Sequence, residues 1–373
     1  MKTRNQLAAI RQKRGIAVAT LAAQIGVKRQ TIYAIEAGSY IPNTLVALRL
    51  AHVLEVSVED LFTLGETAEA PASCEQVDLL VPRHGEMVQP GQPVRLARVG
   101  RRIVGVPASP IPVGLPQADG LVLKIDRLHR GTVQSLDAEA GRAATLVVAG
   151  CDPGMSVLAR QLGRYGDAQL IVAGCSSSQA LSWLKDRKIH VAGAHLRDES
   201  TGEPNLPAVR KLFPRGGYRV ITFANWEEGL VVGRGNPKRI RRVEDLVRKE
   251  VSLVNRERGA GSRFLLDSLL KKQGIATSAV RGYDRIACGH MAAAWYVHSG
   301  EVDCCIAVRA AAQAFGVGFV PLVAERYDLI VPEAHLDLQA VQVMLDVMNR
   351  SSLKRELEAL GGYDTSQTGR VVA

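Results

Sequence analysis

The chain has 373 residues, of which 47% are apolar, and it carries a formal net charge of +10. This length fits two or three domains, and the apolar content is sufficient for ordinary globular cores. A basic chain fits a polyanionic partner such as nucleic acid, although a basic surface is as often a matter of solubility. The sequence shows no secretion signal and no apolar run of membrane-spanning length, so we expect a cytoplasmic protein without a membrane partner.

The six cysteines lack the paired spacing of a structural zinc site. One pattern, Cys288-x-His290 followed by Cys304-Cys305, offers the residue types of a zinc site. Buried cysteines of cytosolic proteins are usually small apolar side chains, however. We therefore expect no metal ion and no cofactor.

The first sixty or so residues contain the pattern of two short helices around a turn. Leu21 and Ile25 mark the apolar face of the first helix, Gly26 permits the turn, and Ile32 and Ile35 give the second helix a buried face. The second helix would present polar side chains at its N-terminal end, as reading of the DNA major groove requires. This outward set comprises Lys28, Arg29, Gln30, Thr31 and Tyr33. The alternative is that the same side chains are the solvated face of a small helical bundle.

Further short helices are expected on both sides of this pair, with Asn43 and Ser57 as N-caps. Residues 4–64 as a whole resemble the Xre/Cro/phage-repressor helix-turn-helix family. The resemblance is carried by Leu21-Ala22, Gly26-Val27, Arg29-Gln30-Thr31-Ile32, Ile35-Glu36-x-Gly38, Pro42, Leu50-Ala51 and Val58-x-x-Leu61-Phe62. It implies that Lys28 to Tyr33 face bases and phosphates of double-stranded DNA, and that the protein is a homodimer on a pseudo-palindromic site.

The middle of the chain changes to an alternating pattern that is typical of β-strands. Residues 94–99 and 103–106 flank a turn at Gly100-Arg101 and predict a hairpin, and residues 121–125 predict a further strand. Such a β-rich segment serves dimerisation or rigid coupling, or it is a spacer packed on the next domain. The sequence does not decide between these roles.

From residue 145 onward, strands and helices alternate, which predicts an α/β domain with parallel sheets. Buried strands are expected at residues 145–149, 169–173, 190–195, 251–255 and 304–308. Helices are expected at residues 157–162, 179–185, 263–273 and 291–298.

Three of the strand-to-helix junctions combine glycine with serine. They are Gly154/Ser156, Gly174/Ser176-Ser177-Ser178 and Gly259/Gly261/Ser262. Glycine lets the backbone approach a ligand closely, and helix N-termini offer free N–H groups. Each junction alone is an ordinary loop, but several of them around one cleft would bind an anion. The chain has neither a Walker A loop nor a G-x-G-x-x-G fingerprint, which disfavours nucleotide binding.

The same region resembles the cytosolic molybdate/tungstate-binding-protein-like domain, a relative of periplasmic type 2 solute-binding proteins. The matching residues are Gly150-Cys151-Asp152-Pro153, His195-Leu-x-Asp198-x-x-Thr201-Gly202, Gly229-Leu-Val-Val232 with Gly235-Asn-Pro237, Asn255-Arg256-x-Arg258-Gly259-x-Gly261-Ser262-Arg263, Glu325-Arg-Tyr327-Asp328 and Gly361-Gly-Tyr363-Asp364-Thr-Ser366. The resemblance implies two α/β lobes joined by crossover strands, with the ligand between them. The first lobe would hold residues 145–222 and 325–373, and the second would hold residues 225–322.

By this resemblance, the expected ligand is a tetrahedral oxyanion, with molybdate or tungstate as the first candidate. The expected ligand-binding residues are Asp152, Ser156, Ser176, Ser177, His195, Arg258, Gly261, Ser262 and Arg263. Three alternatives remain open for individual residues. Arg258 or Arg263 is instead tied to Asp267 or Glu257, His195 is a satisfied core histidine, or Asp152 caps the following helix or orients Arg258.

We therefore predict a multidomain protein. An all-α helix-turn-helix domain at residues 1–65 is followed by a linker and β-rich segment at 66–144 and by an α/β two-lobed periplasmic-binding-protein-like domain at 145–373. The expected function is a one-component DNA-binding transcription regulator that senses molybdate or tungstate. An organic anion or a molybdenum cofactor species is the alternative ligand. A hydrolase is a distant alternative, because Ser, His and Asp are present but no G-x-S-x-G elbow is, so we expect no enzyme.

Overall fold

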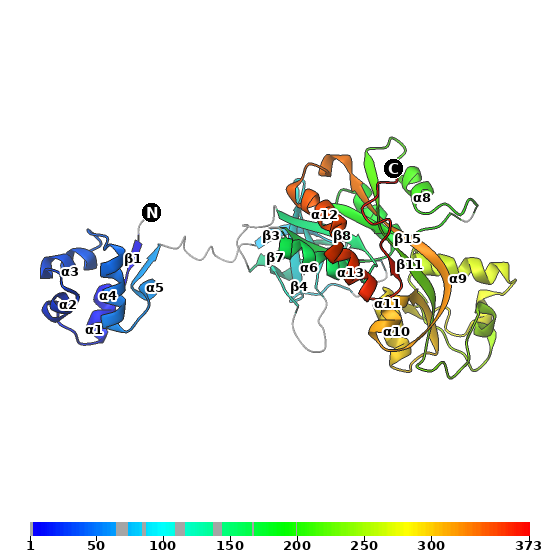
Figure 1. Ribbon diagram of the computed structural model, residues 1–373, viewed down its shortest axis with the longest axis horizontal. Helices are drawn as coiled ribbons and strands as arrows, with labels where there is room; N and C mark the ends of the chain where they lie inside the picture. Colours follow the sequence, from blue (N-terminus) through cyan, green and yellow to red (C-terminus); the bar gives the residue numbers. More distant parts are fainter. Residues whose placement is uncertain are drawn as a thin grey trace. The chain divides into compact units, whose positions relative to one another are not determined.

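The computed structural model describes residues 3–64, 74–83, 87–108, 116–136, 144–165, 168–198 and 200–373. The chain divides into two compact units, Met1–Ser73 and Cys74–Ala373. Figure 1 shows the helical first unit in blue and the mixed α/β second unit in the remaining colours. None of the helices in the described ranges has the length and apolar character that a membrane span requires.

The described part of the first unit is a bundle of five short helices, as the sequence predicts. They are α1 (Leu7–Lys13), α2 (Val18–Ile25), α3 (Arg29–Glu36), α4 (Thr44–Leu54) and α5 (Val58–Leu61). The core contains the apolar residues that the pattern selects, among them Leu21, Ile25, Ile32 and Ile35.

Both predicted N-caps of the bundle are confirmed. The Asn43 side chain accepts a hydrogen bond from the N–H of Val46, and Ser57 forms a capping box with Asp60. The sequence did not predict that β1 (Thr3–Asn5) pairs antiparallel with β2 (Phe62–Leu64), which brings the two ends of the bundle together.

The β-rich middle segment is a closed barrel of five strands within the described residues. They are β3 (Cys74–Leu79), β4 (Pro93–Val99), β5 (Arg102–Pro107), β6 (Gly120–Ile125) and β7 (Arg130–Ser135), in the order β3-β5-β4-β6-β7. The predicted hairpin is the β4–β5 pair, which turns at Gly100-Arg101. Val94, Leu96, Val122 and Val133 fill the interior.

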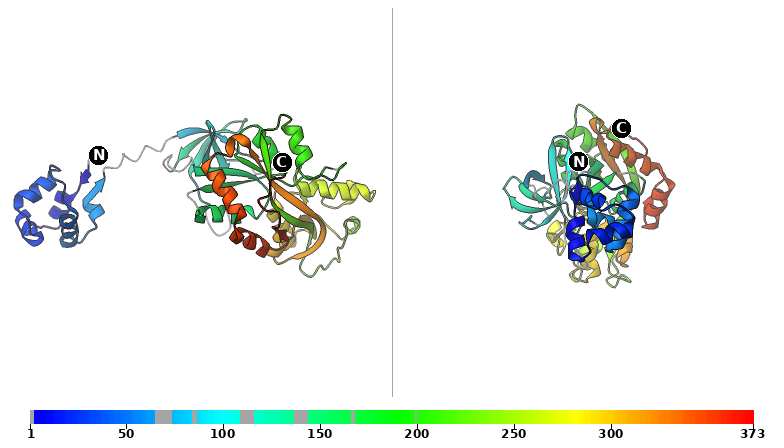
Figure 2. Two further views of the ribbon diagram at one scale, coloured as in Figure 1. Left: turned by 45° about the horizontal axis from the view of Figure 1, so that its top comes forward. Right: turned by 90° about the vertical axis from the view of Figure 1, so that its left-hand side faces the viewer.

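The barrel packs directly on the domain that follows it. Ala97, Val99, Val104 and Val106 of the barrel share one hydrophobic core with residues of β8 (Thr145–Gly150) and β9 (Gln169–Gly174). Figure 2 shows the cyan barrel strands against the green strands of this sheet. Of the roles that the sequence left open, this packing fits rigid coupling or a spacer packed on the next domain.

The α/β domain is built on a seven-stranded mixed sheet in the described residues. The strand order is β14-β11-β15-β10-β8-β9, and β16 pairs with β11. The remaining strands are β10 (Val191–Ala194), β11 (Tyr218–Val232), β14 (Cys304–Val308), β15 (Gly318–Pro332) and β16 (Tyr363–Asp364). β8, β9 and β10 are parallel, whereas β11, β14 and β15 pair antiparallel, so the expectation of purely parallel sheets is wrong.

Helices pack around this sheet. They are α6 (Met155–Tyr165), α7 (Ser177–Lys185), α8 (Leu206–Leu212), α9 (Gly261–Lys272), α10 (His290–His298), α11 (Arg309–Ala314), α12 (Gln339–Asn349) and α13 (Ser351–Ala359). Short 3₁₀ turns are η2 (Val243–Val247), η3 (Thr277–Ala279) and η4 (Glu333–His335), and a small parallel pair joins β12 (Asn255–Arg256) to β13 (Ile286–Ala287).

The predicted strand at residues 251–255 is wrong apart from its last residue. Leu253 makes a single bridge to Cys304, and the Ser252 N–H and hydroxyl donate to the Asp303 carboxylate. The apolar run is therefore buried as a loop, in which the N–H groups of Leu253, Val254 and Asn255 donate to backbone carbonyls of separate segments. A short apolar run does not by itself distinguish these two forms of burial.

Two long strands join the two lobes, as the fold prediction requires. β11 and β15 pair with each other along nearly their whole lengths, with register irregularities between Thr222 and Ala224 and between Glu228 and Gly229. At one end they join β10 and the first lobe, and at the other end β11 joins β14 in the second lobe. A separate hydrophobic core, which includes Leu230, Ile240 and Leu266, belongs to the second lobe. The predicted multidomain architecture with a two-lobed α/β domain is confirmed.

Candidate functional site

Four loops from the two lobes surround one cavity of about 630 Å³. From the first lobe come residues 150–153, after β8, and residues 174–178, after β9. From the second lobe come residues 257–259, before α9, and residues 288–292, at the start of α10. Of the predicted glycine- and serine-containing junctions, Gly174, Ser176, Ser178 and Gly259 line this cavity, whereas Gly154, Ser156, Ser177, Gly261 and Ser262 do not.

The two lobes touch each other at the rim of this cavity. The N–H of Ser178 donates to the carbonyl of Gly259 across the cleft at 3.2 Å. Gly259 has φ +88, and a Cβ there would lie 3.0 Å from Ser178 Cβ and 3.1 Å from Ser176 Oγ. Glycine at this position thus provides both the left-handed backbone and the space for the close approach.

Of the nine predicted ligand-binding residues, all of which the structure describes, Asp152, Ser176 and Arg258 line this cavity. Ser176 is also the N-cap of α7, since its hydroxyl accepts from the N–H of Gln179. Arg258 is exposed. Asp152 accepts hydrogen bonds from the N–H of Gly154 and from the hydroxyl of Tyr363, so it shapes the turn before α6.

Three predicted serines are directed away from the cavity by local hydrogen bonds. The Ser156 hydroxyl donates to the carbonyl of Pro153 on the exposed side of α6. The fully buried Ser177 hydroxyl accepts from the N–H of His195, and the Ser262 hydroxyl donates to Glu228. Serines at helix starts are satisfied locally in this way when a backbone or carboxylate acceptor is nearer than the cleft.

Two further predictions lie behind the cavity wall. Gly261 sits so close to His195 that a Cβ would come within 2.6 Å of the imidazole Cε1. Arg263 donates to the carbonyl of Arg256, lies 3.6 Å from Asp267 and stacks 4.3 Å over the Tyr283 ring. The alternative of an arginine tied to Asp267 is therefore the observed arrangement of Arg263.

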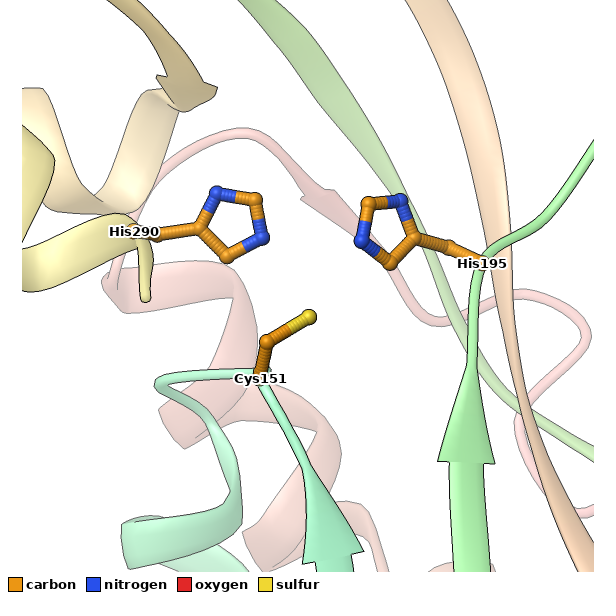
Figure 3. A group of neighbouring side chains, drawn as sticks. All are labelled: Cys151, His195 and His290. Atoms are coloured by element: carbon orange, nitrogen blue, oxygen red, sulfur yellow. The ribbon is translucent and has the colours of Figure 1, made fainter. Parts of the chain in front are cut away.

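At the floor of the cavity, Cys151 and His290 form a cluster with His195, which lies behind the lining. From the sequence, His195 and His290 were named separately, and this grouping was not predicted. Cys151 follows β8, His195 follows β10, and His290 is the first residue of α10. Their donor atoms all lie within 4.8 Å of one another. Figure 3 shows the two imidazole rings facing each other above the Cys151 thiol. These residues are far apart in the sequence and follow no motif spacing, because they come from three separate elements that only the folded chain brings together.

Carboxyl groups lie directly behind this cluster. Glu325 Oε2 is 2.7 Å from His195 Nδ1, and Glu228 lies 3.7 Å from the same nitrogen and 4.0 Å from His290 Nδ1. Burial, with a contribution from Glu325, raises the pKa of Glu228 to about 8. Burial also raises the pKa of Asp152 to about 7 and raises the pKa of Glu325.

The cationic side chain closest to this floor is already matched. Arg256 is 1% exposed, and its guanidinium pairs with Glu257 through bonds of 2.8 and 2.9 Å. A neighbouring pair of this kind contributes little net positive charge to the cavity floor. Within the described residues, the floor therefore carries acidic groups beside a paired arginine, whereas the rim carries helix N-termini and the exposed Arg258.

Family models match both halves of the chain. A helix-turn-helix model matches residues 7–61, and a model of the PBP superfamily domain matches residues 159–349. The chain belongs to the PBP superfamily. The combination of this domain with a helix-turn-helix domain confirms that part of the sequence interpretation, while the expected oxyanion is not tested by it.

Relatives are found for each half as well. The uncharacterized protein YvgK of Bacillus subtilis is 32% identical over 239 residues, which cover 64% of this chain and 77% of YvgK. A protein of Clostridium pasteurianum, encoded in the 5′ region of a 2Fe-2S ferredoxin gene, is 36% identical over 110 residues, or 29% of this chain and 97% of that protein. The HTH-type transcriptional regulator YgzD of B. subtilis is 36% identical over 63 residues, or 17% of this chain and 96% of YgzD.

Similar solved structures include substrate-binding proteins of transport systems. A phosphate-bound protein of this kind from Clostridium perfringens has a TM-score of 0.44 and 14% identity, and covers 58% of this chain and 97% of its own. The sulfate-binding protein SubI of Mycobacterium tuberculosis has a TM-score of 0.44 and 18% identity, and covers 59% of this chain and 85% of its own.

Proposed function

We propose that the chain is a one-component transcription regulator that binds DNA through its first unit and a small anion in the cavity of its PBP domain. The observation that carries the ligand class is the meeting of four loops, each at or just before the start of a helix, around one cavity. Helix N-termini favour anions through free N–H groups and the positive end of the helix dipole. A tetrahedral oxyanion, molybdate or tungstate, is the first candidate.

The rim of the cavity supports an anion more than its floor does. The start of α7 with the Ser176 hydroxyl and the exposed Arg258 lie at the lining, and Arg83 of the barrel adds a second exposed guanidinium. Arginine binds oxyanions through charge-assisted, often bidentate, hydrogen bonds. The proposed ligand therefore contacts the rim, where both lobes contribute.

The DNA-binding part of the proposal depends on α3. Ile32 and Ile35 hold one face of this helix in the core, while Lys28, Arg29 and Gln30 are exposed and Tyr33 is 59% exposed. Such a surface suits contacts to base edges and phosphates. Because regulators of this type usually read pseudo-palindromes, we propose a homodimer, in which ligand-dependent closure of the lobes alters DNA affinity. In this proposal the cavity binds a signal and does not catalyse a reaction.

The size of the cavity favours a second candidate ligand. A volume of about 630 Å³ lies within the range of roughly 300–1,000 Å³ that is typical of sites for organic ligands. A tetrahedral oxyanion fills a small part of that space. An organic anion or a molybdenum cofactor species is therefore the alternative to the bare oxyanion.

Calorimetric titration of the full chain with molybdate, tungstate, sulfate and phosphate tests the ligand class. We expect saturable binding of molybdate or tungstate, weakened at least tenfold by Arg258→Ala because one charge-assisted contact is removed. Arg215→Ala is the matched control, since Arg215 is exposed and does not line the cavity. Heat from none of the four anions would contradict the oxyanion and favour the organic anion.

A further inference from the structure

Three potential metal ligands meet at the cavity floor from three different parts of the chain. The Cys151 thiol and one nitrogen each of His195 and His290 lie within 4.8 Å of one another. Around a tetrahedral zinc ion, ligand atoms at about 2.1–2.3 Å from the metal are separated from one another by roughly 3.5 Å. The group is therefore close to the required size, and the orientation in Figure 3, with both rings and the thiol converging, fits a common centre.

The histidines lack the partners that a purely structural role would give them. His195 and His290 are 2% and 0% exposed. Among the described residues, His195 Nε2 and both nitrogens of His290 have no hydrogen-bond partner of ordinary geometry. A buried polar group without a hydrogen-bond partner destabilises the fold. Binding of a cation by these nitrogens would remove that destabilisation, whereas an ordinary packing role would not.

The surroundings of His195 are those of a metal-binding histidine. Its Nδ1 is 2.7 Å from Glu325 Oε2. In the tautomer whose Nδ1–H donates to this carboxylate, the lone pair of Nε2 is left for another partner. Metal-bound histidines commonly donate their second N–H to a carboxylate, which fixes the tautomer and the orientation of the ring. The N–H of His195 itself donates to the Ser177 hydroxyl, which holds the backbone in place.

The charges around the cluster favour a cation. Glu228 and Asp152 are buried at or next to the floor, the Glu325 side chain is 9% exposed, and Arg256 is paired with Glu257. A divalent ion held by the three side chains would be compensated by the Cys151 thiolate and by a neighbouring carboxylate. The floor thus differs in ligand preference from the anion-favouring rim.

We infer that Cys151, His195 and His290 form a binding site for a thiophilic divalent transition metal ion of the zinc class. One thiolate and two imidazoles are borderline-soft ligands that suit zinc and cobalt, and not magnesium or calcium. Three protein ligands leave a fourth position, and Cys151 and His290 both line the cavity, so that position opens toward it. This inference goes beyond the proposed anion binding and does not depend on it. It also differs from the expectation from sequence, which considered a zinc pattern of Cys288, His290, Cys304 and Cys305 and expected no metal.

Titration of the full chain with cobalt(II), after removal of metals by a chelator, tests the site. We expect one cobalt ion per chain and a near-ultraviolet thiolate-to-cobalt charge-transfer band, both displaced by zinc. Cys151→Ala should abolish the band and weaken cobalt binding at least tenfold. His290→Ala should weaken binding to a similar extent while circular dichroism shows an unchanged fold. Glu325→Gln should weaken binding about tenfold, because the carboxylate no longer supports His195.

Cys288→Ser is the matched control, because Cys288 lines the same cavity but lies outside the group of three. It should retain the wild-type stoichiometry and band. Absence of saturable cobalt binding by the wild-type chain would overturn the inference, as would an unchanged band in Cys151→Ala or loss of the band in Cys288→Ser. No oxyanion is present in this titration, so its failure and the failure of the calorimetric anion test are separate results.

Discussion

At the scale of single residues, the buried ring of Tyr327 restricts which side chains fit at two neighbouring positions of the PBP domain, Gly150 and Gly193. This tyrosine is fully buried, and Gly150 and Gly193 of the neighbouring strands lie against it. A Cβ at Gly193 would come within 2.5 Å of Tyr327 Cζ and 2.7 Å of Cε1. These glycines are therefore needed for packing, and Gly193 has no left-handed backbone to explain it.

Gly193→Ala should lower the free energy of unfolding by about 1–3 kcal/mol, because an overpacked core must shift the buried ring. Urea unfolding followed by circular dichroism measures the change. Gly163→Ala is the control, since Gly163 is exposed on α6 and an added Cβ meets nothing within 4 Å. There the substitution should be neutral or stabilise by up to about 1 kcal/mol. Equal effects of the two substitutions would contradict the packing argument.

A second residue-scale prediction concerns His190, which is buried beside β8. Its Nδ1 accepts from the N–H of Val147 at 3.0 Å, and the His335 ring lies 5.5 Å away. Burial, and to a smaller extent His335, lower the pKa of His190 from 6.5 to about 4 against an opposing hydrogen bond to Arg98. Between these pH values the unfolded chain binds a proton that the folded chain does not bind. Stability contributed by neutral His190 is therefore lost as the pH falls through this window.

From pH 7 to pH 5, the free energy of unfolding should fall by about 2 kcal/mol more in the wild type than in His190→Gln, whose side chain does not titrate. The comparison cancels the titration of carboxyl groups that both proteins share. Parallel pH profiles for the two proteins would show that His190 does not control acid stability.

At the residue scale, the sequence identified loops more reliably than side-chain directions. Asp152 and Ser176 line the cavity. The hydroxyl of Ser177, the next residue after Ser176, instead accepts from the buried N–H of His195, and the Ser262 hydroxyl donates to the buried Glu228. A rotation of one residue about a helix start decides between these outcomes, and the residue pattern does not contain that angle. The grouping of Cys151, His195 and His290 was out of reach for a different reason, since only the assembled sheet brings the three residues together.

At the scale of elements, a largely buried ion pair between α1 and α3 positions α3. The Arg11 guanidinium of α1 makes two bonds, of 2.6 and 3.2 Å, to the Glu36 carboxylate at the end of α3. Both side chains are largely buried, at 12% and 11% exposure. This bidentate pair fixes α3 against α1, and so it fixes the direction of the exposed Arg29 and Gln30.

Arg29→Ala and Gln30→Ala should each weaken binding of operator DNA by roughly 5- to 150-fold in a gel shift, because each removes a proposed contact worth about 1–3 kcal/mol. Their thermal stability should equal that of the wild type, since both side chains are exposed. His52→Ala, on the exposed side of α4, is the control and should change neither property. Unchanged affinity in both α3 variants would exclude this helix as the DNA-reading element.

Elements with a strong period were predicted well, and elements that depend on distant partners were not. The apolar stripes of α2, α3 and α4 and the hairpin of β4 and β5 follow from local pattern and turn residues. Closure of the barrel requires β3 to pair with both β5 and β7, and the β1–β2 pair joins residues some sixty positions apart in sequence. Such pairings are set by packing of the whole unit, so a local pattern does not reveal them.

At the scale of the whole α/β domain, the cavity of the proposed ligand lies where the two lobes touch. β11 and β15 run through both lobes, and Ser178 meets Gly259 at the cavity rim. A ligand that contacts both sides of the rim favours this closed arrangement by its difference in affinity between closed and open forms. Substitutions that hinder closure should therefore weaken binding without touching the ligand.

Gly259→Ala should reduce molybdate affinity at least tenfold, because the new Cβ would lie 3.0 Å from Ser178 Cβ and 3.1 Å from Ser176 Oγ. Gly235→Ala is a closely matched control. Gly235 also has a left-handed backbone, with φ +72 compared with +88 for Gly259, but an added Cβ there meets nothing within 4 Å. Both variants bear a similar backbone strain, of about 1–2 kcal/mol, and only one obstructs the meeting of the lobes. Calorimetric titration distinguishes them, and an equal loss of affinity in both would mean that strain, and not lobe contact, governs binding.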